Sequence, residues 1–209
     1  MIHIYIMYLP ISEKNDGNRT GQKHRTEHEA GTELLAVGLR ELYGMELNRD
    51  RLSYGQHGKP YLRNHPEIHF NISHCEGLAV CVFSDTETGV DVERIREVKE
   101  KVIPKVFDRA EQELLFWNKA EKEKYKEIFY RFWTLKESYV KQSGQGMTVK
   151  LTDFAFQPEL DPGWREVPCT DEKVGAMQCK LKEKWILSVC VEKRVSEGGT
   201  SVSSVKKQI

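Results

Sequence analysis

Short apolar runs, some of which alternate with polar residues as in 2–8, mark several short strands along this chain. Successive side chains of a strand point to opposite faces of a sheet, so an alternating run predicts a strand with one buried face. Turn residues separate most of these runs. The predicted strands cover residues 2–8, 69–72, 78–83, 89–93, the vicinity of 154, 177–179 and 185–191.

A helix is predicted between Thr26 and Gly44. Thr26 and Glu29 have the spacing of a capping box, in which a hydroxyl and a carboxylate satisfy free amides at a helix start. Apolar residues then recur on one helical face as far as Leu42. Gly44 can adopt the left-handed conformation that commonly ends a helix.

Two more helices are predicted in the second half of the chain. Asp108 and Glu111 have the spacing of another capping box, which opens a short helix. A longer helix is predicted over about 126–142 from its apolar and aromatic positions. The segment 119–126 is a charge-dense connector, interpreted as a solvated helix or loop rather than a binding site.

The order of these elements suggests two units, because each half runs from a helix to strands. The predicted boundaries are 1–95 for the first unit and 96–193 for the second. Residues 10–25 are polar and predict a mobile loop. Residues 194–209 are dominated by Ser, Gly and Lys and predict a disordered tail.

Composition excludes several classes of function. Lys plus Arg and Asp plus Glu each number 32, so no global charge favours nucleic acid or an anionic membrane. No apolar run approaches the length of a membrane span, and the N-terminal residues lack the basic region of a signal peptide. Five scattered cysteines without CxxC spacing indicate reduced thiols in the cytoplasm and argue against a zinc site.

Candidate metal ligands lie in the predicted strand 89–93. Asp91 and Glu93 are two residues apart, so a strand presents both carboxylates on one face. Two adjacent carboxylates repel each other, and a hard cation such as Mg²⁺ relieves that repulsion. Taken alone, however, such a pair is more often an ordinary solvent-facing strand edge.

The predicted long helix carries three further candidates. Glu137 and Lys141 are four residues apart on one helical stripe, which also contains Trp133. A surface ion pair between Glu137 and Lys141 explains this spacing as well as a ligand site does. Lys136 points about 100° away from the stripe and is expected to reach a different part of a ligand.

Potential phosphate ligands occur earlier in the chain. Lys59 and Pro60 place a cation in a stiff turn, and Ser73 and His74 follow the predicted strand 69–72. A hydroxyl, an imidazole and an ammonium group can all donate to phosphate oxygens. Each feature alone is common on surfaces, but together with the carboxylates they suit a diphosphate ligand bound with magnesium.

Four blocks of sequence stand in a definite order. They are Gly58-Lys59-Pro60, Phe70-Asn71-Ile72-Ser73-His74-Cys75, Gly89-Val90-Asp91-Val92-Glu93, and Phe132–Lys141 followed by Gly144-Gln145-Gly146. Together they resemble the 4′-phosphopantetheinyl transferases of the larger, monomeric, surfactin-synthetase-activating type. The resemblance covers residues 50–160 well and the opening strand and helix loosely. One departure is Cys75, where the family usually has serine, and this change is expected to be neutral.

The resemblance implies an α+β fold of two similar α/β-sandwich halves related by a pseudo-two-fold axis. Coenzyme A (CoA) and Mg²⁺ would bind in the cleft between the halves. Its implied metal ligands are Asp91, Glu93 and Glu137. Its implied CoA-binding residues are Arg25, His28, Lys59, Pro60, Ser73, His74, Lys136 and Lys141.

The resemblance also implies the reaction. The serine hydroxyl of an apo acyl or peptidyl carrier protein would attack the β-phosphate of CoA, accept the 4′-phosphopantetheine arm and release 3′,5′-ADP. Glu137 is the expected general base, directly or through a water, and Lys141 would neutralise charge on the transferred phosphate. A basic and apolar patch within 94–109 is expected to receive the carrier protein. A monomeric, cytoplasmic protein that binds neither nucleic acid nor membrane is expected.

Two alternatives remain open at this point. A magnesium-dependent phosphohydrolase could use the same three carboxylates on another diphosphate, although it would not require Lys59, Ser73 and His74 in this order. A non-catalytic CoA-binding or carrier-binding protein could also keep the scaffold. The complete set of Asp91, Glu93, Glu137 and Lys141 argues against it.

Overall fold

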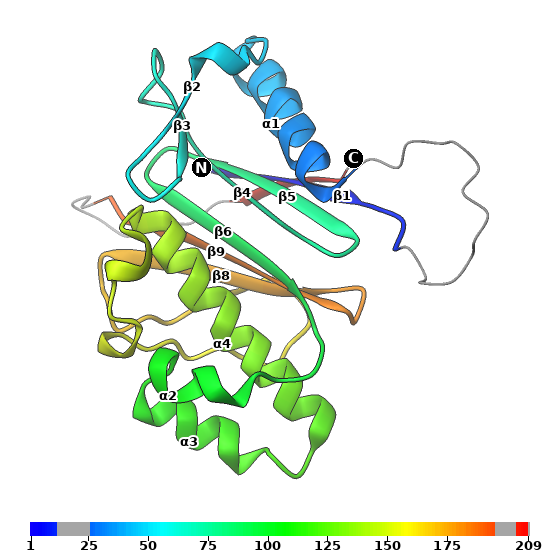
Figure 1. Cartoon of the computed structure of the whole chain (residues 1–209), viewed down its shortest axis with the longest axis vertical. Helices are drawn as coiled ribbons and strands as arrows, with labels where there is room; N and C mark the ends of the chain where they lie inside the picture. Colours follow the sequence, from blue (N-terminus) through cyan, green and yellow to red (C-terminus); the bar gives the residue numbers. More distant parts are fainter. Residues whose placement is uncertain (12–25, 195–203, 209) are drawn as a thin grey trace.

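The computed structural model describes residues 1–11, 26–194 and 204–208. These residues form two four-stranded sheets and a small two-stranded hairpin, with helices packed on the outside (Figure 1). No helix within these ranges is long and apolar enough to cross a membrane. The strands are β1 (Ile2–Tyr8), β2 (Leu52–Tyr54), β3 (Pro60–Leu62), β4 (His69–Cys75), β5 (Leu78–Ser84), β6 (Thr88–Arg94), β7 (Arg165–Val167), β8 (Val174–Leu181), β9 (Trp185–Glu192) and β10 (Ser204–Gln208). The helices are α1 (Glu27–Tyr43), α2 (Ile103–Val106), α3 (Arg109–Trp117) and α4 (Lys122–Ser143).

The two sheets face each other across a shared apolar core. Ile4 and Val82 of the first sheet meet Val90 and Leu187 of the second sheet in one buried cluster. Alternate residues point away from this core, toward α1 on one side and α4 on the other (Figure 1). The result is a helix–sheet–sheet–helix arrangement, which confirms the α+β class. The pseudo-two-fold relation between the halves stays a prediction.

Helix α1 confirms the first capping box. The Thr26 hydroxyl accepts a hydrogen bond from the Glu29 amide, and the Glu29 carboxylate accepts one from the Thr26 amide. Leu34, Leu35 and other apolar residues of one helical face are buried against the first sheet. Gly44 ends the helix with a φ of 64°, in the left-handed region that glycine occupies without strain.

The first sheet has the strand order β10-β1-β5-β4. Strand β10 pairs in parallel with β1, with Ile2 opposite Ser204. The predicted disorder of the tail is therefore wrong for 204–208, while 195–203 and 209 lie outside the described residues. Most of the predicted loop at 10–25 also lies outside them, because positions 12–25 are not described.

The second half differs from the sequence-based predictions at the start of α4 and near residue 154, and α2 and β7 were not predicted. Helix α4 begins at Lys122, so part of the predicted charge-dense connector is the solvated first turn of that helix. The strand predicted near 154 is absent from the described chain. In its place, Leu151–Asp153 form a 3₁₀ turn, and Phe156 makes an isolated bridge to Cys169. The capping box of Asp108 and Glu111 is confirmed at the start of α3.

Edge strands β4 and β6 belong to different sheets, yet side chains of β4 hold them together. The Asn71 side-chain oxygen accepts a hydrogen bond from the Val90 amide at 3.0 Å. The Ser73 hydroxyl accepts one from the Val92 amide at 3.3 Å. All four residues are buried, so these two bonds satisfy backbone donors that a strand partner would otherwise satisfy.

Strand β6 approaches α4 so closely that only glycine fits at position 89. A Cβ atom on Gly89 would lie 2.1 Å from the Ser138 carbonyl oxygen and 2.2 Å from the Gln142 amide nitrogen. Both atoms belong to helix backbone and cannot rotate away. Gly89 therefore sets the distance between the strand and the helix that carry the candidate ligands.

Gly89→Ala is expected to lower the free energy of unfolding by about 1–3 kcal/mol or more, because the added methyl group overpacks this contact. Chemical denaturation would measure the change. Gly175→Ala in β8 is the matched control, since its nearest atom, Val191 Cγ2, would lie at an ordinary 3.4 Å. Equal destabilisation of the two variants would contradict the steric role of Gly89.

Candidate functional site

The candidate site is a cavity of about 360 Å³ where β4, β6 and α4 meet. Seven of its lining residues were singled out by the sequence, either as candidate ligands or as members of the helical stripe of Glu137. The lining residues are Ile72, Ser73, His74, Asp91, Val92, Glu93, Trp133, Glu137 and Lys141. The structure therefore brings together three of the four sequence blocks in one place.

Periodicity explains how these side chains converge. Gly89, Asp91 and Glu93 alternate along β6 and so share the face that Gly89 presses against α4. On α4, Glu137 and Lys141 are one turn apart and share the face turned toward the cavity. The close approach at Gly89 then places the carboxylates of the strand opposite the charged stripe of the helix.

Lys141 is the centre of the polar contacts in this site. Its ammonium group lies 2.6 Å from Asp91 Oδ1 and 3.1 Å from Ser73 Oγ. Ser73 Oγ also donates to Asp91 Oδ1 at 3.1 Å. Lys141 is thus paired with a carboxylate of β6 and does not form the surface ion pair with Glu137 that its spacing also allowed.

The carboxylates differ in how they are satisfied. Glu93 pairs with Arg96 at 3.1 Å, whereas Asp91 Oδ2 is buried without a hydrogen-bond partner. Burial and the neighbouring charge of Asp91 raise the pKa of both Glu93 and Glu137, and Lys141 partly offsets this. A buried carboxylate oxygen without a partner beside two further carboxylates is a donor set that suits a hard divalent cation.

The three carboxylates are not gathered into a finished metal site. No three His, Cys, Asp or Glu side chains in the described part of the chain are arranged to hold a metal ion as they stand. Lys141 engages Asp91 and Arg96 engages Glu93. The metal-ligand role therefore stays a prediction for Asp91, Glu93 and Glu137. These three carboxylates do line one cavity.

Two predicted histidines lie together at the edge of the cavity. The rings of His28 on α1 and His74 on β4 are 5.8 Å apart in a T-shaped arrangement. Burial, followed by the charges of His28 and Lys141, lowers the pKa of His74. The neutral imidazole can still donate one hydrogen bond to an anion. Arg25, the other candidate from this part of the chain, lies outside the described residues.

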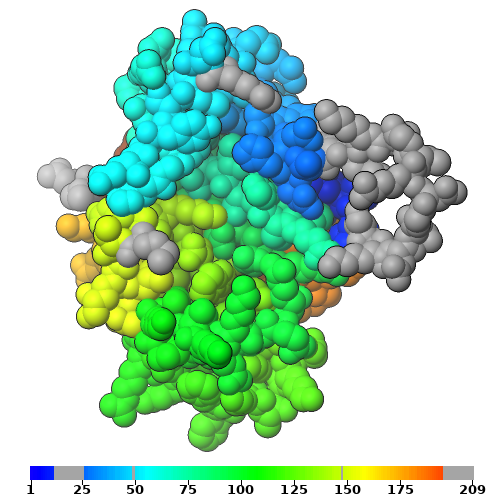
Figure 2. Space-filling model, viewed as in Figure 1, coloured from blue at the N-terminus to red at the C-terminus, as the bar shows by residue number. Residues whose placement is uncertain are grey.

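A second hollow of about 220 Å³ continues from the candidate site toward Lys59 and Pro60. The two hollows share Ile72 and Lys141. Lys59 pairs with Glu87 at 2.5 Å and donates to the Gln142 carbonyl oxygen at 2.9 Å. In Figure 2, the cyan segment that contains β2 and β3 lies against the yellow segment that follows α4. Lys59 and Pro60 therefore face the same groove as Lys141, farther along it.

The prediction that Lys136 binds the ligand is wrong. The structure does not bring it to the cavity: its side chain is fully buried and pairs with Glu111 of α3 at 2.9 Å. It also donates to the carbonyl oxygens of Leu151 and Phe154. The offset of about 100° from the Glu137 stripe was right, but that direction leads into the interior, where the ammonium group holds α3 and the 151–156 segment against α4.

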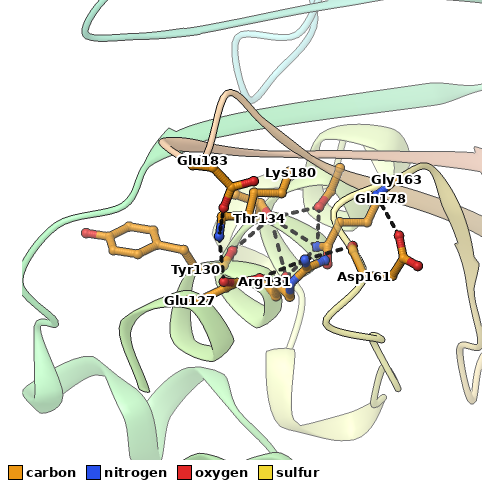
Figure 3. Close-up of polar contacts among 10 residues, drawn as sticks. Glu127, Tyr130, Arg131, Thr134, Asp161, Gly163, Gln178, Lys180 and Glu183 are labelled. Atoms are coloured by element: carbon orange, nitrogen blue, oxygen red, sulfur yellow. Dashed lines mark hydrogen bonds and ion pairs between the residues drawn. The ribbon is translucent and has the colours of Figure 1, made fainter. Parts of the chain in front are cut away.

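A buried polar network between α4 and the second sheet escaped the sequence analysis (Figure 3). Arg131 bonds to Glu127 and to the Gln178 side chain, and Gln178 donates to the Arg131 carbonyl oxygen and to Ser188. Ser188 in turn contacts Thr134 at 2.7 Å. Polar residues recurring at the inward positions of α4, β8 and β9 were the available signal. The network fixes α4 in one register beside β6.

A cleft lined by carboxylates, a lysine, a hydroxyl and an imidazole is the kind of site that binds a ligand with phosphate groups. Comparison with known proteins identifies the class of protein. Residues 87–190 match the 4′-phosphopantetheinyl transferase superfamily. This match contains both Asp91 and Glu137.

Individual relatives agree. The chain is 31% identical to the 4′-phosphopantetheinyl transferase Sfp of Bacillus subtilis (strain 168), over 66% of this chain and 60% of that protein. It is 32% identical to the 4′-phosphopantetheinyl transferase ffp of Bacillus subtilis, over 75% of this chain and 70% of the relative. It is 33% identical to the 4′-phosphopantetheinyl transferase HetI of Nostoc sp., over 68% of this chain and 65% of the relative. The chain belongs to the 4′-phosphopantetheinyl transferase superfamily, which confirms the resemblance of the sequence blocks.

Lys136→Met is expected to lower the free energy of unfolding by about 3–5 kcal/mol, because it leaves the Glu111 carboxylate buried without a counter-ion. Burial already raises the pKa of Glu111, and Lys136 opposes that rise. In the variant the penalty exists only while Glu111 is ionised. The loss should therefore be largest above the raised pKa and should shrink as the pH falls through it.

Denaturation of the single variants and of the double variant Glu111→Gln/Lys136→Met from pH 4 to 8 would measure this coupling. The double variant should recover part of the stability that Lys136→Met loses at neutral pH. Additive losses that do not depend on pH would contradict the assignment of Lys136 as the partner of Glu111.

Proposed function

We propose that this chain transfers the 4′-phosphopantetheine arm of CoA to a serine hydroxyl of an apo acyl or peptidyl carrier protein and releases 3′,5′-ADP. Membership of the superfamily supports this activity. The observation that carries it is the buried Asp91 carboxylate, which has one oxygen without a partner and the other held by Lys141, in a cavity that also contains Glu93 and Glu137.

The residues present fit a divalent cation. Asp91, Glu93 and Glu137 would hold Mg²⁺, as oxygen ligands of the type that this ion prefers. When bound, the ion would neutralise charge on the diphosphate of CoA. The unpartnered Asp91 Oδ2 is the atom most in need of such a ligand, because a buried carboxylate oxygen without a donor is unfavourable.

The groove offers a path for the rest of CoA. Ser73, His74 and Lys141 would contact phosphate groups at the cavity, with His28 beside His74. Lys59 and Pro60 would face the nucleotide end, since they line the hollow that continues from Lys141. Arg25 stays a candidate for the ribose 3′-phosphate on sequence grounds alone. Lys136 is withdrawn from this set.

Glu137 is the proposed general base. As the carrier serine oxygen bonds to the β-phosphorus atom of CoA, its proton would pass to Glu137, directly or through a water. The bond from phosphorus to the 3′,5′-ADP leaving group breaks in the same displacement. Lys141 would neutralise charge on the transferred phosphate.

Asp91→Ala and Glu137→Gln are each expected to lower kcat/KM by about 10²–10⁴-fold, since each removes a ligand or the base. The assay mixes the protein with CoA, Mg²⁺ and an apo carrier protein and follows the carrier by mass spectrometry. Exposed Glu172→Gln, on the turn before β8, is the control and should retain full activity.

The outcomes of this assay separate the alternatives. A phosphohydrolase would cleave CoA without a gain of mass on the carrier, and a non-catalytic protein would leave both unchanged. No gain of a phosphopantetheine arm across several carriers would overturn the proposed function. Transfer that survives both substitutions would keep the activity and overturn the proposed roles of the carboxylates.

The segment 94–109 is the proposed receiving surface for the carrier protein. It begins with Arg94, the last residue of β6 and the neighbour of Glu93, so it starts at the edge of the cavity. Arg96, Lys99, Lys101 and other basic residues are exposed along it, and Ile95 and Val98 are only partly buried. Exposed cations beside apolar side chains suit an acidic partner with an apolar anchor. A cytoplasmic monomer remains part of the proposal, and the free cysteines suit a reducing compartment.

Lys99→Glu/Lys101→Glu is expected to raise KM for the carrier protein about tenfold at low salt and to leave KM for CoA unchanged, because rim charges act mainly on encounter. Exposed Lys173→Glu, before β8, is the charge-matched control for a general field effect. Titration of each substrate at two ionic strengths measures the effect. An equal rise in KM for the carrier with Lys173→Glu would contradict a local docking surface.

A further inference from the structure

Lys141 holds one oxygen of the Asp91 carboxylate, Oδ1, while the other oxygen, Oδ2, has no hydrogen-bond partner. Its ammonium nitrogen lies 2.6 Å from Asp91 Oδ1, and Ser73 Oγ lies 3.1 Å from both that oxygen and the Lys141 nitrogen. Asp91 is buried, with 8% of its side chain exposed, so Lys141 is its direct counter-ion. Within the described chain, Lys141 and Ser73 make all the hydrogen bonds that the Asp91 carboxylate receives.

The charges around the cavity are not balanced. Asp91, Glu93 and Glu137 supply three carboxylates, against which Lys141 and Arg96 are the nearby cations. Arg96 pairs with Glu93, so Lys141 is the cation whose field reaches both Asp91 and Glu137. If Lys141 moved away with nothing in exchange, Asp91 would be a buried charge without a partner, which is strongly unfavourable.

A metal ion on Asp91 Oδ2 and the Lys141 ammonium group on Oδ1 would repel each other across a single carboxylate. Mg²⁺ binds carboxylate oxygens at about 2.0–2.1 Å. An ammonium group 2.6 Å from the same carboxylate would then stand within a few ångströms of a divalent charge and be repelled by it. Lysine is a compact charge on a flexible stem, and 30% of this side chain is exposed, so it has room to move into the cavity.

We propose that Lys141 acts as an internal cation that holds Asp91 until the diphosphate of CoA draws it away and frees Asp91 for the metal. The inference rests on the proposed function, since it takes CoA and a divalent cation as the ligands of this site. Metal and CoA then bind with positive coupling, because each favours the same displaced position of Lys141.

The test is the affinity for Mn²⁺, a paramagnetic divalent probe, measured by electron paramagnetic resonance or calorimetry with and without saturating CoA. In the natural chain, Mn²⁺ alone should bind weakly, and CoA should tighten binding by about tenfold or more. Lys141→Met should bind Mn²⁺ alone about tenfold more tightly than the natural chain and should lose most of the enhancement by CoA. Lys141→Arg keeps the charge and should retain weak binding of Mn²⁺ alone.

Lys59→Met is the matched control. Lys59 is the other lysine of the groove, but it pairs with Glu87 and not with Asp91. Its loss should leave the affinity for Mn²⁺ alone unchanged. Thermal unfolding gives a second readout that does not depend on catalysis: Mn²⁺ should raise the Tm of Lys141→Met more than that of the natural chain, because the ion replaces the missing counter-ion.

The two levels of the proposal fail differently. The inference alone is overturned if Lys141→Met binds Mn²⁺ no more tightly than the natural chain does, while CoA still enhances binding in the natural chain. The proposed function would survive that result. Absence of Mn²⁺ binding in every protein even with CoA overturns the metal site of the proposed function, and the inference with it. If Lys141→Met does not fold without metal, recovery of its folding by Mn²⁺ supports the proposal, and failure of Mn²⁺ to restore it is evidence against it.

Discussion

The contact of β6 with α4 at Gly89 is the constraint on which the rest of the site depends. The absence of a side chain there lets a strand and a helix approach until a Cβ would overlap the Ser138 carbonyl oxygen. At that distance, two residues farther along β6, Asp91 comes within reach of Lys141. Glu93, a further two residues along β6, lines the same cavity. A larger residue at position 89 would separate the strand from the helix and with it the carboxylates from the lysine.

Buried polar side chains also join α4 to β8 and β9, the strands beyond β6 in the same sheet. Arg131, Gln178, Thr134 and Ser188 are almost fully buried, and each has hydrogen-bond partners. Apolar contacts tolerate sliding, whereas a buried hydrogen-bond network loses several bonds at once when the helix shifts. A slip of one residue would turn Glu137 and Lys141 by about 100° away from β6. The network therefore gives the helix a single register, which a site built across two elements requires.

The sequence predicted what depends on local periodicity. Alternation in β6 and the four-residue spacing of Glu137 and Lys141 fixed which side chains share a face, and both capping boxes were confirmed. It failed where the answer depends on distant segments. The fate of Lys136 is decided by Glu111, which lies 25 positions away, and the pairing of β10 with β1 joins the two ends of the chain. Helical spacing gives the direction of a side chain, but not what occupies the space in that direction. The metal-ligand roles of the carboxylates stay predictions.

Lys136 and Lys141 show how burial divides two lysines of one helix between structure and chemistry. Each pairs with a buried carboxylate, but the Lys136 side chain is fully buried while 30% of Lys141 is exposed. Lys136 is enclosed by carbonyl oxygens that no ligand can replace, so its pair with Glu111 is permanent. Lys141 borders a cavity, and a diphosphate entering there would offer its ammonium group more negative charge than Asp91 does. The proposed exchange of lysine for metal would keep the buried Asp91 carboxylate neutralised both before and after the ligand binds.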